Sequence, residues 1–169
     1  MDKEARVKPF RFRALVGTAA AAVMIATPGS AGASTRTADL SGAAHQYLVD
    51  SAPVATASTA FQSTVIAWMG NPKVTGAEAG SAARPLISAL LSFQNELKSQ
   101  TWPADAQDDI RALVLTFNGL IGDLRGLSHD HIADTSSWEG PFLRDDVSTT
   151  AATNRVRHDL GLPPLSVSV

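Results

Sequence analysis

Apolar side chains recur at steps of three and four residues along four stretches of the chain. This spacing places them on one face of a helix. The stretches run over residues 43–69, 75–100, 101–127 and 137–160. Glycine, proline and polar residues separate them, and such residues interrupt helices. No stretch alternates apolar and polar residues as a half-buried strand does. The pattern therefore predicts an all-α fold.

The third stretch has the widest apolar face. Asp105, Asp108 and Asp109 lie near its start, where the positive end of a helix dipole favours acids. A wide apolar face has to be buried against other helices. We therefore predict an antiparallel four-helix bundle over residues 43–164. The apolar face of the third stretch consists of Ile110, Leu113, Val114, Phe117, Leu120, Ile121, Leu124 and Leu127.

Prolines are expected to kink this bundle. Pro53 predicts either a kinked first helix or a division into two pieces, with Ser51 capping the second piece. Pro85 predicts a kink or a later start for the second helix. Pro141 is expected in or near the first turn of the fourth helix, where proline is tolerated.

Other residues predict where helices begin and end. Thr75 and Glu78 have the spacing of a capping box, in which each side chain bonds the other's backbone N–H. Ser136 and Glu139 offer a second box. Gly161 is suited to end the fourth helix, and residues 165–169 are expected to form a loose tail.

Residues 1–33 read as an export signal. A basic start precedes an uncharged run over residues 14–26, and an A-x-A site follows at Ala31-Gly32-Ala33. This order is typical of a secretory signal peptide. We predict cleavage before Ser34, a short polar leader over 34–42, and a secreted or extracytoplasmic location. The alternative is an uncleaved anchor, although a spanning helix needs about 20 apolar residues.

Charge and composition then exclude several classes of protein. Cleavage would remove five of 14 basic and two of 16 acidic residues, leaving nine and fourteen, a net charge of −5. Nucleic acids and anionic lipids bind basic clusters, so neither is an expected partner. A membrane is expected only through an uncleaved signal segment. The sequence has no cysteine, which excludes disulfides and a lipid-bearing cysteine.

Few residues suggest chemistry. His129 and His131 are the candidate metal ligands, with Asp134 as a possible third, but zinc takes three or four ligands in a defined geometry. We interpret them as a solvated loop and predict no metal or cofactor. The sequence contains no phosphate-binding, zinc-protease or serine-hydrolase motif.

Two pairs of acids that are adjacent in sequence, and one histidine, are the other candidates for catalysis. Asp108–Asp109 and Asp145–Asp146 are adjacent in sequence, and adjacent residues on a helix point in different directions. We expect both pairs on solvated faces or near a helix start. His158-Asp159 resembles half of a catalytic triad, but a histidine near a helix end more often meets the helix dipole. We therefore predict no catalytic residues and no enzyme.

Two binding functions remain. An interaction module for an envelope or extracellular protein should leave an apolar patch uncovered. A carrier of a small apolar or haem-like ligand should instead hold it in an internal cavity. Trp68, Trp102 and Trp138 lie near the segment ends, where they would cover the core or line a pocket. The cavity of a carrier is expected to be lined by Phe61, Phe93, Phe117 and Trp102.

Several short stretches support a resemblance. They are Tyr47-Leu48 with Ala52-Pro53-Val54, Ser92-Phe93-Gln94, Ser99-Gln100-Thr101-Trp102-Pro103, Leu120-Ile121-Gly122-Asp123-Leu124 and Val156-Arg157-His158-Asp159-Leu160-Gly161-Leu162-Pro163. Together they resemble small secreted or lipoprotein-like all-helical proteins of actinobacteria, a group with no assigned activity. The resemblance implies a helical fold and a place in the cell envelope, and it transfers no site residue. This chain departs from the lipoproteins in having no cysteine.

Overall fold

The structure is a computed structural model that describes residues 34–68, 74–128 and 136–165. It contains four α-helices, α1 (Ser34–Trp68), α2 (Gly76–Ser99), α3 (Gln107–Gly126) and α4 (Ser136–Asp159), with a short 3₁₀ turn, η1 (Ala104–Ala106), before α3. The described residues form no strand. The predicted all-α bundle is confirmed.

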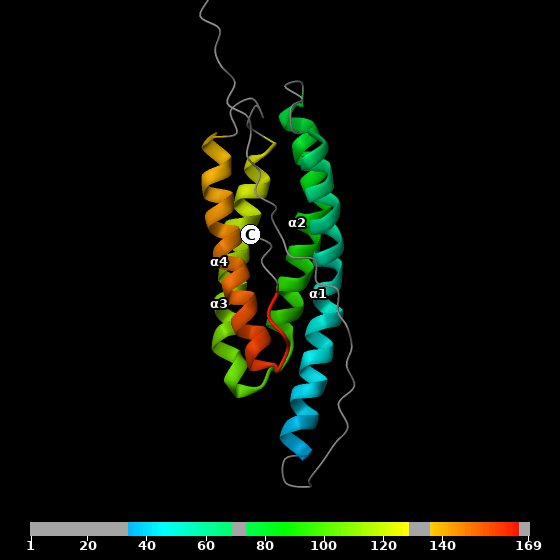
Figure 1. The fold of residues 1–169 in the computed structure, drawn as a ribbon, viewed down its shortest axis with the longest axis vertical. Helices are drawn as coiled ribbons and strands as arrows, with labels where there is room; N and C mark the ends of the chain where they lie inside the picture. Colours follow the sequence, from blue (N-terminus) through cyan, green and yellow to red (C-terminus); the bar gives the residue numbers. More distant parts are fainter. Residues whose placement is uncertain (1–33, 69–73, 129–135, 166–169) are drawn as a thin grey trace, which may run out of the picture.

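The helices run alternately up and down, with the α1–α2 pair beside the α3–α4 pair (Figure 1). Packing follows chain order: α3 and α4 share the most extensive contact, and α2 packs on both α1 and α3. Helix α1 has 35 residues and is about 52 Å long. Its N-terminal end extends past the ends of the other helices (Figure 1).

The core lies along the axis between the four helices. Every helix contributes to it, and the predicted face of α3 is almost entirely buried. Tyr47, Leu90, Leu113, Leu124 and Val156 are the largest of the fully buried side chains. Side chains from all four helices therefore share one hydrophobic core.

Helix α1 differs from the prediction at two points. It begins at Ser34, so residues 34–42 are helical and not a separate polar leader. It also continues through Pro53 as one helix. Ser51 is not a cap, because its hydroxyl donates to the carbonyl of Leu48 within the helix, at 3.2 Å. Pro53 is exposed, so the helix accommodates its ring on the solvent side.

The boundaries of α2 and α4 follow the sequence more closely. Thr75 N–H donates to Glu78 at 2.8 Å and Glu78 N–H to Thr75 at 3.3 Å, which confirms the capping box. Pro85 lies inside α2 without dividing it. Gly161 has a φ of 70° just after α4, the left-handed conformation that glycine adopts readily. The side chains of Ser136 and Glu139 lie outside those described.

The chain after α4 folds back onto that helix. Leu162 N–H donates to the carbonyl of Arg157 at 2.7 Å, and Arg157 donates to the carbonyl of Pro163 at 2.6 Å. Leu165 N–H donates to the side chain of Asn154 at 2.7 Å. The predicted loose tail, residues 165–169, therefore includes one residue too many at its start, because Leu165 is hydrogen-bonded to α4. Residues 166–169 lie outside the described residues.

The predicted signal, residues 1–33, also lies outside the described residues and stays a prediction. None of the described helices is both long and apolar enough to cross a membrane.

Candidate binding site

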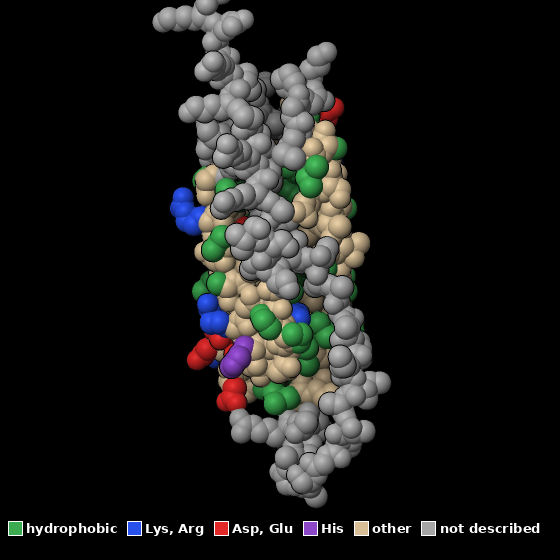
Figure 2. All heavy atoms as spheres, viewed as in Figure 1, with side chains coloured by type: hydrophobic (Ala, Val, Ile, Leu, Met, Phe, Trp, Pro, Cys, Tyr) green, Lys and Arg blue, Asp and Glu red, His purple; other side chains and the backbone are tan. Residues whose placement is uncertain are grey.

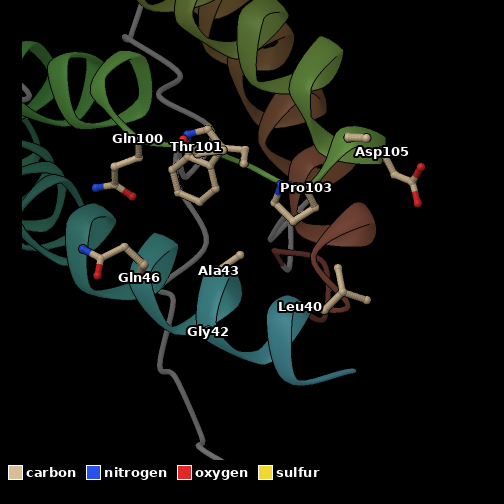
Figure 3. Close-up of a pocket in the computed structure, with 10 residues that line it drawn as sticks. Leu40, Gly42, Ala43, Gln46, Gln100, Thr101, Pro103 and Asp105 are labelled. Atoms are coloured by element: carbon tan, nitrogen blue, oxygen red, sulfur yellow. The ribbon is translucent and has the colours of Figure 1, made fainter. Parts of the chain in front are cut away.

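A pocket opens where the N-terminal part of α1 passes the connection from α2 to η1 (Figure 3). Its volume is about 590 Å³, within the range of small-molecule sites. Five of its lining residues are apolar: Leu40, Ala43, Trp102, Pro103 and Ala104. Four are polar: Gln46, Gln100, Thr101 and Asp105. A pocket of this composition can hold an apolar body and orient a polar end.

Gln46, Gln100, Thr101 and Asp105 form the polar wall of the pocket. The carboxylate of Asp50 orients two of these side chains. The side-chain amide of Gln46 donates to one oxygen of Asp50 at 2.8 Å, and that of Gln100 donates to the other at 2.7 Å. Since a carboxylate only accepts hydrogen bonds, both amide nitrogens must face Asp50. Gln100 directly follows α2, so the carboxylate also ties α1 to the end of α2.

The apolar wall is held in place by the core. Trp102 is 6% exposed, and its indole N–H donates to the carbonyl of Leu97 at 2.9 Å. Its ring meets the ring of Tyr47 edge-on, with centroids 6.3 Å apart. Tyr47 in turn packs edge-on against Phe93 at 5.4 Å. These contacts hold the indole ring of Trp102 in a defined orientation.

A buried polar cluster lies next to this aromatic group. Tyr47 on α1 has a hydrogen bond to the side chain of Thr153 on α4 and lies near Arg157. Burial raises the pKa of the Tyr47 phenol to about 12, with Arg157 and Thr153 opposing the rise. The phenol is therefore protonated near neutral pH. This cluster joins α1, α4 and the folded-back chain, and it is a structural link.

A second acidic group lies between α3 and α4. The carboxyl groups of Asp123 on α3 and Asp145 on α4 lie close enough to interact electrostatically. Burial, and then the charge of Asp145, raise the pKa of Asp123, while Arg144 lowers it. Burial alone raises the pKa of Asp146 to about 6.

These acids correct part of the sequence interpretation. Asp145 and Asp146 are half-buried and not on a solvated face. As expected, the carboxyl groups of Asp145 and Asp146 do not converge on one point, because Asp145 interacts with Asp123 on α3. Asp108 and Asp109 do lie at the start of α3, where they meet Arg111 at 3.1 Å and Arg155 at 3.0 Å.

The candidate metal ligands His129 and His131, with Asp134, lie outside the described residues. Within the described part of the chain, no group of three or more histidine or acidic side chains is placed to hold a metal. His158 is exposed, and its Nδ1 is 3.3 Å from Asp159. This exposed neighbouring pair lacks the buried, oriented histidine that a triad requires.

The aromatic residues expected around a carrier cavity are divided between core and pocket. Trp102 lines the pocket, whereas Phe61, Phe93 and Phe117 belong to the hydrophobic core. The rings of Phe93 and Phe117 are 5.7 Å apart. Trp68 is partly buried against the same core, and the side chain of Trp138 is outside those described. The pocket therefore lies at the end of the bundle and not along its axis.

The outer face of α1 is the other surface with unusual composition. Residues 51–68 include no charged side chain. The hydroxyl groups of Thr56, Thr59, Ser63 and Thr64 each donate to the carbonyl four residues earlier, at 2.9–3.1 Å. In Figure 2 the side over α1 is mainly tan and green, while charged side chains gather on the α3–α4 side. Val49 and Ile66 are exposed on α1.

The sequence indicated Trp102 as a possible pocket residue, but it did not indicate the polar wall. Gln46 and Asp50 are four residues apart, so they share a helix face, and this spacing was a usable signal. The partner Gln100 is 50 residues from Asp50 in sequence. Only the packing of α1 on α2 brings them together.

Comparison of the chain with protein families, curated proteins and solved structures finds no significant match.

Proposed function

We propose that the chain is an exported binding protein of the cell envelope that holds a small ligand in the pocket between α1 and the α2–η1 connection. Export is supported by the signal pattern in residues 1–33. Binding is supported by the pocket, whose volume of about 590 Å³ and mixed lining suit a small molecule with one polar end. The pocket is the observation that carries this proposal.

The ligand is not expected to be a haem. A haem site supplies an axial ligand such as histidine, cysteine, methionine or tyrosine. The residues that line the pocket include none of these four types. We therefore narrow the carrier hypothesis to a small organic molecule at the bundle end.

Filling the pocket tests the proposal. Gly42 lines it, and a side chain added at Gly42 would meet no atom within 4 Å at its Cβ. Gly42→Phe should therefore occupy the pocket without disturbing α1. Gly122→Phe is the matched control, because Gly122 is equally open and lies on α3, outside the pocket lining.

The measurement is native mass spectrometry of the protein purified from its own host. We expect a small molecule to accompany the original chain and Gly122→Phe but not Gly42→Phe. The same spectrum should give the mass of a chain that begins at Ser34. Absence of a bound molecule from the original chain, or its retention by Gly42→Phe, would contradict the proposal.

A second candidate function is docking of an envelope or extracellular protein on α1. The uncharged face over residues 51–68, together with exposed Val49 and Ile66, favours it. Such a face loses little hydration when another uncharged surface covers it. A photo-crosslinking residue at Thr59 should then capture one defined partner in intact cells. The same residue at exposed Ser88 on α2 should not, and equal capture at both positions would reject this function.

A further inference from the structure

The polar wall of the pocket offers hydrogen-bond acceptors. The amide nitrogens of Gln46 and Gln100 are engaged by Asp50, so the opposite, oxygen ends of both amides are turned away from that carboxylate. In Figure 3 the oxygen of Gln100 lies on the side toward Thr101 and its nitrogen on the other side. Thr101 adds a hydroxyl group to the same wall. A ligand that donates hydrogen bonds would match these groups.

The charge around the pocket has one sign. Asp105 lies at the rim with its carboxylate directed outward (Figure 3), and Asp50 accepts from the side-chain nitrogens of Gln46 and Gln100 at 2.8 and 2.7 Å. The lining contains no lysine or arginine. A positively charged ligand would therefore meet attraction and no repulsion from the side chains that surround it.

The end of α2 adds to this field. Helix α2 ends at Ser99, and the next two residues, Gln100 and Thr101, line the pocket. The C-terminal end of a helix carries a partial negative charge, which favours cations. The peptide dipoles of α2 and the nearby carboxylates therefore both make the electrostatic potential in the pocket more negative.

The geometry does not suit a bare metal ion. Calcium takes six to eight oxygens in a compact shell, and magnesium takes six. The acceptors here lie along one wall, and Leu40, Ala43, Trp102 and Pro103 supply apolar surface beside them. A cation with an apolar body would cover that surface while its donors meet the wall.

We propose that the pocket binds an organic ammonium ion carried on a small apolar body. The ammonium group donates to the side-chain oxygen of Gln100, in the field of Asp50 and the end of α2. The apolar body lies against Trp102 and Pro103. This inference rests on the proposed function, since it names the class of ligand for the same pocket.

Two probes of nearly equal shape test the charge requirement. The ¹⁵N-labelled full chain is titrated near neutral pH with phenethylammonium chloride and with neutral 2-phenylethanol. The NMR signals followed are the side-chain amides of Gln46 and Gln100 and the indole N–H of Trp102. We expect the ammonium probe to shift these signals and to bind about tenfold more tightly, the effect of one charge-assisted hydrogen bond. Equal binding of the two probes, or no shift with either, would overturn the inference.

Substitution of single acids shows which carboxylates strengthen binding of the ammonium probe. Asp50→Asn and Asp105→Asn each remove one negative charge at the pocket. Asp50→Asn should weaken the ammonium probe several-fold, and Asp105→Asn, at the rim, should weaken it less. Asp105 is exposed, so its variant should keep the fold even if loss of Asp50 loosens α1. Asp108→Asn removes an exposed acid outside the pocket lining and should leave the affinity unchanged. Equal effects of all three variants would overturn the inference.

A further probe separates two sources of the ammonium group. N-acetyl-lysine methylamide represents a lysine side chain of a protein partner, and phenethylammonium represents a free amine. Tighter binding of phenethylammonium supports a free small amine, and tighter binding of the lysine probe supports a lysine-bearing partner. If a neutral or acidic molecule accompanies the native protein and is lost in Gly42→Phe, the ammonium inference fails while the proposed function stands.

Discussion

Asp50 shows how one side chain can serve both the fold and a binding wall. Its two carboxylate oxygens are occupied by Gln46 and Gln100, which fixes the register of α1 against the end of α2. The same bonds decide which ends of the two amides remain for a ligand. Under the proposed function, support of the fold and recognition of the ligand would depend on the same contacts, as in preorganised sites.

At the same scale, half-buried Asp146 makes stability depend on pH. Burial raises its pKa from 3.8 to about 6, so the folded protein holds a proton that the unfolded chain has already lost. The contribution to the free energy of unfolding is therefore fully present below pH 3.8 and is lost as pH rises through about 6. Asp123, whose pKa is also raised, acts in the same direction.

Asp146→Asn should remove part of this dependence. Urea unfolding across this pH range should show a smaller loss of stability for Asp146→Asn than for the original chain, and greater stability at neutral pH. Asp108→Asn should leave the profile unchanged, because Asp108 is exposed. A profile for Asp146→Asn that parallels the original would contradict the assignment.

At the scale of elements, the side chain of Asp145 on α4 packs directly against α3 at Gly119. A Cβ added there would collide with the carboxylate of Asp145, whereas one added at Gly122 would meet no atom within 4 Å. Replacing glycine by alanine inside a helix stabilises it by up to about 1 kcal/mol when nothing else changes. The two glycines should therefore respond differently to the same substitution.

Gly122→Ala should raise the free energy of unfolding, and Gly119→Ala should raise it less or lower it. In an Asp145→Ala background the two substitutions should become equal, because the colliding carboxylate is gone. Urea unfolding of these variants measures the difference. Equal effects in the original background would show that the Asp145 carboxylate moves aside at no cost.

The helices could be predicted where the residues within a single helix show a clear pattern. The apolar face of α3 and the Thr75–Glu78 box could be read directly from spacing. The start of α1 could not, since residues 34–42 are polar and small and contain no capping pattern. Pro53 left open whether α1 is one helix or two, and the structure shows one continuous helix with Pro53 exposed to solvent. The pocket depends on the pairing of Asp50 with Gln100, which no local pattern contains.

At the scale of the whole molecule, the core makes the four helices interdependent. Leu124 is fully buried on α3, and side chains from all four helices belong to the same cluster. Loss of one such side chain should therefore lower the stability of the entire bundle and not of α3 alone. The exposed Leu115 on the same helix provides a comparison.

Leu124→Ala should lower the free energy of unfolding by about 2–5 kcal/mol, the range for a large side chain removed from a core. Leu115→Ala should change it by about 0.5 kcal/mol or less, as exposed sites usually do. Chemical denaturation followed by circular dichroism measures both. Similar losses for the two variants would contradict the placement of α3 in the bundle.

The starting point of α1 links the proposed processing to the proposed binding. Helix α1 begins at Ser34, the residue that signal removal would make the new N-terminus, and its first turn contains no acid. Cleavage would therefore place a free α-ammonium at the positive end of the helix dipole, which weakens the first turns. Leu40 and Ala43, on the wall of the pocket, follow only one to three turns later. The precursor and the released protein should thus differ in how readily a ligand enters, so that maturation would also set the accessibility of the site.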